Sequence, residues 1–138
     1  MERIVRWARR RSPWVLHYNS GGCNGCDIEL LDALTPRYDV ERLGIVKEAS
    51  PRHADVLVCT GPVTLKSRDR LLRIYEQIPE PKWVVAAGAC ACSGGMVADT
   101  YNVLGGVDQL LPVAVYIPGC PCRPEAIIAA FVRLLELI

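Results

Sequence analysis

Short apolar runs alternate along the chain with segments whose apolar residues recur at helical spacing. This alternation is typical of strands and helices that follow one another in parallel β/α layers. Five strands are predicted, at residues 14–18, 40–46, 56–60, 83–87 and 113–117. Helices are predicted at residues 27–34, at 65–78 and from Pro124 to the end, with a glycine-rich loop over 88–106 and a helical turn at 107–111.

The strands at 56–60 and 83–87 are almost wholly apolar, which is expected where helices cover both faces of a parallel sheet. We therefore predict an α/β fold, a small doubly wound parallel sheet of the flavodoxin type. The 138 residues are predicted to form a single domain over 13–138, preceded by a basic N-terminal arm over 1–12. In such sheets ligands bind outside the carboxyl ends of the strands, where the strand order reverses.

Charge and hydropathy narrow the classes of partner. The formal net charge of +1 gives no electrostatic basis for nucleic acid as a main partner. No apolar run approaches the roughly 18 residues that a membrane helix needs. The arm over 1–12 carries five arginines and lacks the apolar stretch of a signal peptide. We expect a cytoplasmic chain, at most peripheral to a membrane, whose arm is a solvated tail rather than a contact with anionic lipid or a larger partner.

Seven cysteines are many for a cytoplasmic chain, in which disulfides are disfavoured. Six of them follow predicted strands in three pairs: Cys23 and Cys26, Cys90 and Cys92, and Cys120 and Cys122. Because parallel strands end at the same edge of a sheet, these six thiols are predicted to gather at one edge. Cys59 lies inside a predicted strand and is expected to be a core residue.

Three kinds of site are compatible with these thiols. A Cys₄ zinc site often uses two close pairs, but the one-residue spacers of two pairs here are unusual for it. A thioredoxin-like redox pair uses Cys23 and Cys26 alone and leaves four thiols unexplained. An iron–sulfur cluster takes four thiolates from separate loops. The spacing favours a metal centre, and it favours iron–sulfur only modestly over zinc.

Several motifs together resemble a known family. They are Gly22-Cys-Asn-Gly-Cys-Asp-Ile-Glu29, Leu34-Thr-Pro-Arg-Tyr-Asp39, Ser50-Pro-Arg-His-Ala-Asp55, Thr60-Gly-Pro62, Gly88-Ala-Cys90 and Pro118-Gly-Cys-Pro121 followed by Arg123-Pro-Glu125. In this order they resemble the small iron–sulfur subunit of membrane-bound, energy-converting (group 4) [NiFe] hydrogenases. That subunit is homologous to the 20 kDa (B-type) subunit of complex I, the NADH:quinone oxidoreductase. The resemblance covers nearly the whole chain.

The resemblance implies an electron-relay subunit without catalytic residues of its own. It implies one [4Fe-4S] cluster, whose iron is bound by Cys23, Cys26, Cys90 and Cys120. The implied partners are a [NiFe]-hydrogenase-like large subunit, a ferredoxin-like iron–sulfur subunit and membrane subunits, in a complex on the cytoplasmic side of the cell membrane.

The spacing of the first motif bears on which complex this is. The complex I counterparts carry two adjacent cysteines where this chain has Cys23-Asn-Gly-Cys26. The resemblance is therefore strongest on the hydrogenase side, or to related sulfur-reducing and ferredoxin-oxidising complexes. A quinone-reducing B-type subunit and a zinc-stabilised structural α/β module are the alternatives.

Four residues are expected beside the site without binding iron: Glu29, Cys92, Cys122 and Arg123. The family usually has a non-cysteine at Cys92 and a proline at Cys122. Among ligand substitution, S–H contacts to the cluster and plain burial, we expect burial for both thiols. Glu29 is expected to stabilise a helix start rather than to relay protons. Arg123 could contact the cluster or the large subunit, with helix-start solvation an equal alternative, and His17 is expected to be a satisfied strand histidine.

Overall fold

A five-stranded, wholly parallel sheet forms the centre of the computed structural model, which describes residues 2–138. The order across the sheet is β2 (Val46–Glu48), β1 (Trp14–Asn19), β3 (Val56–Thr60), β5 (Trp83–Ala87) and β7 (Val115–Ile117). In chain order, β1 is the first strand of the sheet, β2 pairs with it on one side, and β3, β5 and β7 are then added one after another on the other side. This is the flavodoxin order, so the predicted fold class is confirmed.

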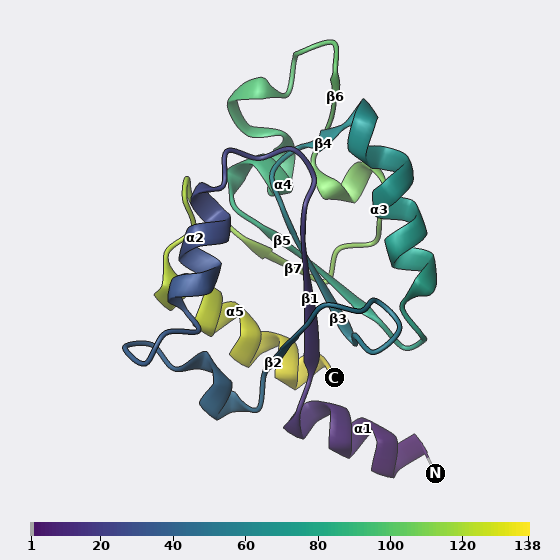
Figure 1. The fold of residues 1–138 in the computed structure, drawn as a ribbon, viewed down its shortest axis with the longest axis vertical. Helices are drawn as coiled ribbons and strands as arrows, with labels where there is room; N and C mark the ends of the chain where they lie inside the picture. The colour runs from purple at the N-terminus through teal and green to yellow at the C-terminus, as the bar shows by residue number, and fades with distance from the viewer. Residues whose placement is uncertain (1) are drawn as a thin grey trace.

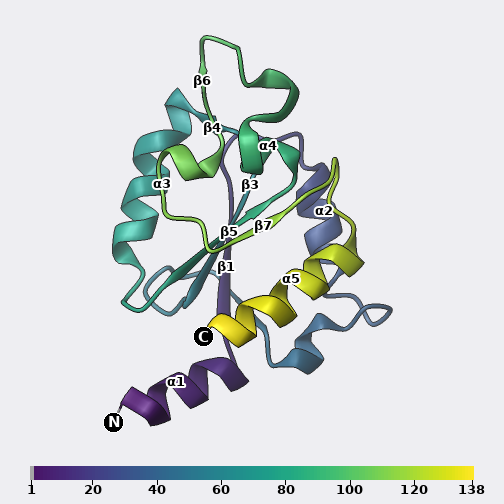
Figure 2. The same ribbon diagram turned by 180° about the vertical axis from the view of Figure 1, so that it is seen from behind.

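Helices cover both faces of the sheet (Figures 1 and 2). On one face lie α2 (Gly25–Asp32) and α5 (Pro124–Leu137), and on the other α3 (Leu65–Gln77) and the short α4 (Ala89–Ser93). Alternate residues of β3 enter different cores: Val58 packs under α2 and α5, whereas Leu57 and Cys59 pack under α3 and α4. Burial on both faces explains why this strand is continuously apolar.

The glycine-rich stretch over 88–106 has more structure than predicted. It contains α4, a 3₁₀ turn (Gly95–Val97) and β6 (Val103–Gly105), which pairs antiparallel with β4 (Val63–Thr64). This small second sheet stands beyond the carboxyl edge of the main sheet, at the top of Figure 1. Helix α3 follows β4 directly, and a capping box between Thr64 and Ser67 fixes its start.

The strand predicted at 40–46 is wrong. Residues Val40–Leu43 form a 3₁₀ turn, and the edge strand β2 begins only at Val46. The turn lies between two residues with left-handed backbone, Asp39 (φ 47°) and Gly44 (φ 86°). Val40 and Ile45 are nonetheless buried, so a folded turn produces the same apolar pattern as a strand.

The N-terminal arm, expected as a solvated tail, forms helix α1 (Glu2–Arg11), while Met1 lies outside the described residues. Arg9 Nε lies 2.9 Å from Asp55 Oδ1, and the Arg6 side chain donates to the carbonyl oxygen of Ile138. These contacts hold α1 at the amino end of the sheet, opposite the cysteine-rich edge (Figure 1). Among the described residues, no helix is both long and apolar enough to cross a membrane.

Candidate metal centre

Three loops at the carboxyl edge of the sheet enclose a small cavity of about 80 Å³. The loops follow β1, β5 and β7, and they bring Cys23, Cys26, Cys90 and Cys120 to the cavity wall. Asn19, Gly22, Thr60 and Gly61, from the ends of β1 and β3, also line the cavity. The cavity therefore lies where the strand order reverses, as predicted for a ligand site in this fold.

The four thiols face one another across this cavity. Burial, followed by the nearby Cys120, Cys26 and Cys23 thiols, raises the pKa of Cys90. Like charges at short range disfavour a further ionisation, so four thiolates here need a positive centre among them. Iron or zinc would supply that charge.

The four thiols are a donor set that either kind of metal centre uses. A zinc site needs four ligands, with sulfur about 2.3 Å from a single ion. A [4Fe-4S] cluster is also held by four thiolates but is itself several atoms across. Four cysteines from three loops around one cavity therefore fit a [4Fe-4S] cluster and also match the ligand count of a zinc site. Across residues 2–138, no three His, Cys, Asp or Glu side chains are grouped closely enough to share one metal ion.

Glycines allow the backbone to approach these sulfurs closely. Gly88 has φ 92°, and a Cβ added to it would lie 2.4 Å from Cys26 Sγ. A Cβ on Gly95 would lie 2.9 Å from Cys90 Sγ, and one on Gly25 would lie 3.5 Å from Cys23 Sγ. Two of the sulfurs therefore occupy space that a larger residue would fill.

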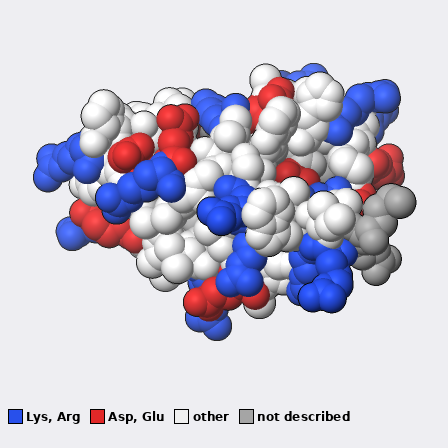
Figure 3. Space-filling model, turned by 90° about the horizontal axis from the view of Figure 1, so that it is seen from below, with Lys and Arg blue, Asp and Glu red and all other residues white. Residues whose placement is uncertain are grey.

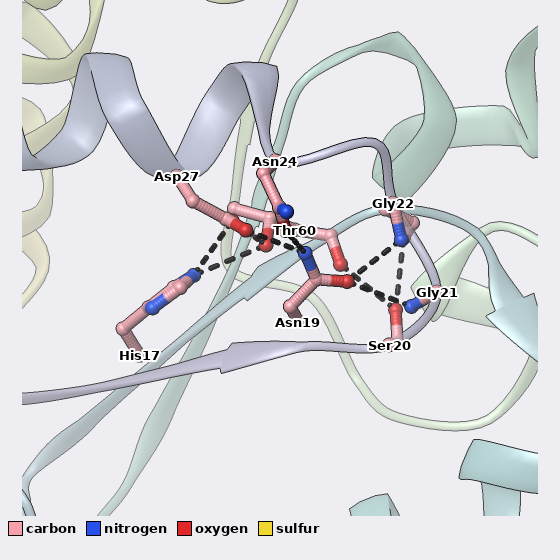
Figure 4. Close-up of polar contacts among 9 residues, drawn as sticks. His17, Asn19, Ser20, Gly21, Gly22, Asn24, Asp27 and Thr60 are labelled. Atoms are coloured by element: carbon pink, nitrogen blue, oxygen red, sulfur yellow. Dashed lines mark hydrogen bonds and ion pairs between the residues drawn. The ribbon is translucent and has the colours of Figure 1, made fainter.

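Asn19 organises the loop that carries the first two thiols (Figure 4). Its Oδ1 accepts hydrogen bonds from the backbone N–H groups of Gly21 at 2.9 Å and Gly22 at 2.7 Å. Its Nδ2 donates to Asn24 Oδ1 at 3.1 Å and to the carboxylate of Asp27. One side chain at the end of β1 thus ties down the loop on both sides of Cys23.

Asp27, in the first turn of α2, anchors the other end of this loop. Its carboxylate accepts hydrogen bonds from Thr60 and Asn19, and Oδ1 lies 2.9 Å from His17 Nε2 (Figure 4). Burial raises the pKa of Asp27, but the bonds from Thr60 and Asn19 and the adjacent His17 outweigh it, so the pKa lies below its ordinary value. The expectation that His17 is a satisfied strand histidine is confirmed.

This polar network was not predicted from the sequence. Asn19 and Asp27 bracket the first cysteine pair, and Thr60 ends the neighbouring strand. Their positions could have suggested the contact, because the β1–β3 register places Asn19 directly beside Thr60.

The two extra thiols lie outside the cavity wall and in different places. Cys122 is fully buried under α2 and α5, and Cys26 packs against the same core. The neighbouring Cys122 thiol is the main cause that lowers the pKa of Cys26 to about 6, whereas the pKa of Cys122 itself is raised. Cys92 Sγ instead donates to the carbonyl oxygens of Ala86 and Ile117, at 3.6 Å each.

Of the other predicted residues, Cys59 is a core residue as expected, and burial raises its pKa to about 12. Glu29 lies in the second turn of α2, half-buried, where its charge raises the pKa of Cys26 slightly. Arg123 is exposed at the residue before α5. Neither Glu29 nor Arg123 lines the cavity.

The α/β fold of this chain is also found in a hydrogenase. An NAD⁺-reducing [NiFe]-hydrogenase structure matches with a TM-score of 0.71, at 21% identity, over 91% of this chain and 92% of that chain, which shows the shared fold. The sequence places the chain more narrowly. It belongs to the family of the 20 kDa subunit of NADH:ubiquinone oxidoreductase, whose pattern matches residues 23–134. The resemblance drawn from the motifs is confirmed.

Relatives within this family come from more than one kind of complex. The chain is 54% identical over 126 residues to the probable membrane-bound hydrogenase subunit mbhJ of Pyrococcus furiosus, covering 91% of this chain and 75% of that protein. It is 48% identical over 138 residues to the B-type subunit of the NADH-quinone oxidoreductase of Citrifermentans bemidjiense, covering 100% and 79%. A chain from the membrane-bound sulfane sulfur reductase, an archaeal respiratory membrane complex, matches with a TM-score of 0.87 and 41% identity, covering 99% and 76%.

The contact of Gly88 with Cys26 predicts that Gly88→Ala loses most of its bound iron after the full chain is loaded with iron and sulfide. The added Cβ must displace Cys26 Sγ from the cavity wall. Gly105→Ala is the matched control, because Gly105 also has positive φ (113°) but its Cβ would meet only Gln109 Cγ at 3.5 Å. Both variants should unfold about 1–2 kcal/mol more easily. Equal iron loss in the two variants would contradict the inference that Gly88 leaves the space that Cys26 Sγ occupies.

The hydrogen bonds of Asn19 predict that Asn19→Ala destabilises the metal-free chain by about 2–3 kcal/mol, because two part-buried partners, Asp27 and the N–H of Gly22, and the exposed N–H of Gly21 lose their bonds. The free energy of unfolding in urea measures this change. Asn102→Ala is the control, since the Asn102 side chain is exposed and its backbone oxygen alone bonds to Leu65. It should change stability by less than about 0.5 kcal/mol.

Proposed function

We propose that this protein is the electron-relay subunit of a membrane-associated oxidoreductase of the hydrogenase and complex I kind. It would hold one [4Fe-4S] cluster through Cys23, Cys26, Cys90 and Cys120. The observation that carries this proposal is the convergence of these four thiols, from three separate loops, on one cavity at the switch point of the sheet. The cluster supplies one-electron chemistry, and the chain binds, shields and orients it.

The exposure of the four thiols supports a relay role. Cys26 and Cys90 are half-buried, whereas Cys23 and Cys120 are exposed at the rim. The cavity thus has a protein-covered floor and an open side, through which a partner can come close to the cluster. Burial at the floor shields the sulfurs of Cys26 and Cys90 from water, and burial of a cluster is one of the factors that set its reduction potential.

Exposed apolar side chains on the segment that follows α4 support the proposal that a catalytic subunit docks there. The segment between α4 and β6 carries Met96 and Tyr101, which are 94% and 91% exposed. Such side chains are enriched in the buried centres of protein interfaces. A [NiFe]-hydrogenase-like large subunit is the partner that we propose for this end of the molecule, and a ferredoxin-like iron–sulfur subunit would exchange electrons with it through the cluster.

The choice among complexes rests on the first motif and on the relatives. The two-residue spacer between Cys23 and Cys26, together with the higher identity to the hydrogenase relative than to the quinone oxidoreductase relative, supports a hydrogenase-like complex. A quinone-reducing B-type subunit is the second candidate, supported by 48% identity over the whole chain. Nickel in the purified native complex distinguishes the first from the second, and zinc without iron would indicate a structural module.

We also propose that the subunit is peripheral on the cytoplasmic side of the membrane and that α1 meets the anionic lipid surface. Arg6 and Arg9 hold α1 to the domain, which leaves Ile4 and Trp7 outward, 71% and 61% exposed. Arg3, Arg10 and Arg11 are also exposed. Figure 3 looks onto this end of the molecule and shows several basic side chains, some beside uncharged surface and some beside acidic side chains. Exposed Trp and Arg together are typical of helices that lie in a membrane interface.

The ligand assignment predicts that the loaded full chain contains about four irons and four sulfides and absorbs visible light. Cys23→Ala should lose this absorption and most of the iron, because one of four ligands is gone. Cys59→Ala should retain both, since Cys59 is buried in β3 away from the cavity. Undiminished iron and absorption in Cys23→Ala would overturn the assignment.

The placement of α1 predicts that the full chain co-sediments with vesicles that contain phosphatidylglycerol and does so less as salt is raised. Each interfacial arginine contributes about 1 kcal/mol. A triple change to Gln at Arg3, Arg10 and Arg11 should therefore release the chain from the vesicles. The control makes the same change at three exposed arginines of α3, Arg68, Arg70 and Arg73. If both triple variants bind alike, or the unaltered chain never binds, α1 serves another partner.

A further inference from the structure

A second cavity, of about 550 Å³, lies at the other end of the molecule, between α1 and the amino end of the sheet. Figure 1 shows the C-terminal end of α5 beside α1 in this region. The volume falls within the range of about 300–1,000 Å³ that is typical of small-molecule sites. Three separate parts of the chain line the cavity: Val5, Arg6 and Arg9 of α1, then Glu80, Pro81 and Trp83 around the start of β5, and Ile138.

The inner wall of this cavity is apolar and belongs to the folded core. Ile138 is 3% exposed, and the partly buried Trp83 packs against the same core. Helix α1 does not fill the space, because within residues 2–138 neither core contains a residue of α1, and Val5 remains 43% exposed. An aliphatic chain that entered the cavity would remove both this surface and its own from water, which is favourable.

Two arginine side chains form the polar part of the wall. Arg6 donates through Nε to the carbonyl oxygen of Ile138, and Arg9 Nε lies 2.9 Å from Asp55 Oδ1. A guanidinium group carries five N–H donors in a planar fork. Both arginines hold α1 through Nε, so their Nη groups can bind an anion in the cavity without releasing the helix.

The side chains around the cavity carry an excess of positive charge. Glu80 Oε1 lies 3.2 Å from Lys82 Nζ, so this pair is neutral overall. Arg9 and Asp55 form a second neutral pair. The charge of Arg6 is left over, which favours a ligand with an anionic head group and an apolar tail.

We propose that this cavity binds one anionic phospholipid of the membrane, with its phosphate on Arg6 and Arg9 and one acyl chain against Val5 and Trp83. Such binding rests on the proposed function, since it requires α1 to lie at the lipid surface. Charge complementarity supports this occupant, because arginine binds phosphate through two parallel N–H groups.

This site is distinct from the surface contact proposed for α1. The outward Ile4 and Trp7 and the exposed arginines of α1 would meet many lipids at once, whereas the cavity holds a single molecule. Both surfaces belong to one helix, so a lipid in the cavity can come from the membrane on which α1 lies. A phospholipid held from inside the domain would fix the orientation of the subunit on the membrane.

The test is calorimetric titration of the full chain with dihexanoylphosphatidylglycerol, kept below its critical micelle concentration so that no lipid surface is present. One molecule should bind per chain. Dihexanoylphosphatidylcholine should bind at least about tenfold more weakly, because the guanidinium groups repel its choline group. Arg6→Gln should weaken binding of the anionic lipid about tenfold, since a charge-assisted hydrogen bond to the phosphate is lost.

A matched pair of α1 variants separates the cavity from the outer surface. Val5→Trp fills the cavity and keeps both arginines, so the monomeric anionic lipid should no longer bind. Ile4→Trp adds an equally large side chain at a position that is 71% exposed and should bind like the unaltered chain. Circular dichroism of each variant checks that α1 is retained.

The inferred site is overturned if the unaltered chain shows no one-to-one binding, if Val5→Trp and Ile4→Trp bind alike, or if the two lipids bind equally. Co-sedimentation with phosphatidylglycerol vesicles then separates the outcomes. Vesicle binding without monomer binding leaves the surface contact of α1 standing and removes the cavity site. Loss of both removes the proposed membrane contact as well, whereas the electron-relay function is tested separately by the iron content of the loaded chain.

Discussion

Parallel pairing of all five strands is the constraint on which the site depends. Because β1, β3, β5 and β7 run in the same direction, each ends at the same edge, and the loops after β1, β5 and β7 meet there. Residues almost a hundred positions apart in the sequence, such as Cys23 and Cys120, thereby share one cavity. The pairing is held by strands that are buried on both faces, so core packing and site geometry are inseparable. A change that slips β3 against β1 would also move Thr60 away from Asp27.

Charge repulsion and desolvation oppose the ionisation of the thiols at this edge of the sheet. Four thiolates close together repel one another, and half-burial of Cys26 and Cys90 adds a desolvation cost. The loop that carries Cys23 is nonetheless fixed in place, because Asn19 Oδ1 accepts hydrogen bonds from the N–H groups of Gly21 and Gly22. Glycines are essential here because only they bring the main chain this close to sulfur. Preorganisation of this kind would let the chain take up the proposed cluster with little rearrangement.

Much of this arrangement could be predicted from the sequence. Strands β3 and β5 were predicted to the residue, and six thiols were placed at one edge from their positions after strands, whereas the family resemblance alone singled out the four that line the cavity. The predictions that failed concern two local segments, the strand expected at 40–46 and the N-terminal arm. The buried Val40 and Ile45 belong to a folded turn, and apolar pattern alone does not distinguish a short buried turn from a short strand. Helix α1 was missed because its arginines bond to the folded domain, through Asp55 and the carbonyl of Ile138, which are remote in sequence.

The two extra thiols show how local structure decides the fate of similar motifs. Cys90 and Cys92 both lie in α4, and residues two apart on a helix point to nearly opposite sides. If Cys90 faces the cavity, Cys92 must face the sheet, and it donates to the ends of β5 and β7. Cys120 and Cys122 lie in a turn before α5 rather than in a helix, so no such periodicity separates them. The chain there folds tightly enough that a Cβ on Gly119 would lie 2.7 Å from the Cα of Cys122. This compact turn places the second thiol in the core against which Cys26 packs, so the same one-residue spacer gives a thiol bonded to the ends of β5 and β7 in one loop and a fully buried core thiol in the other.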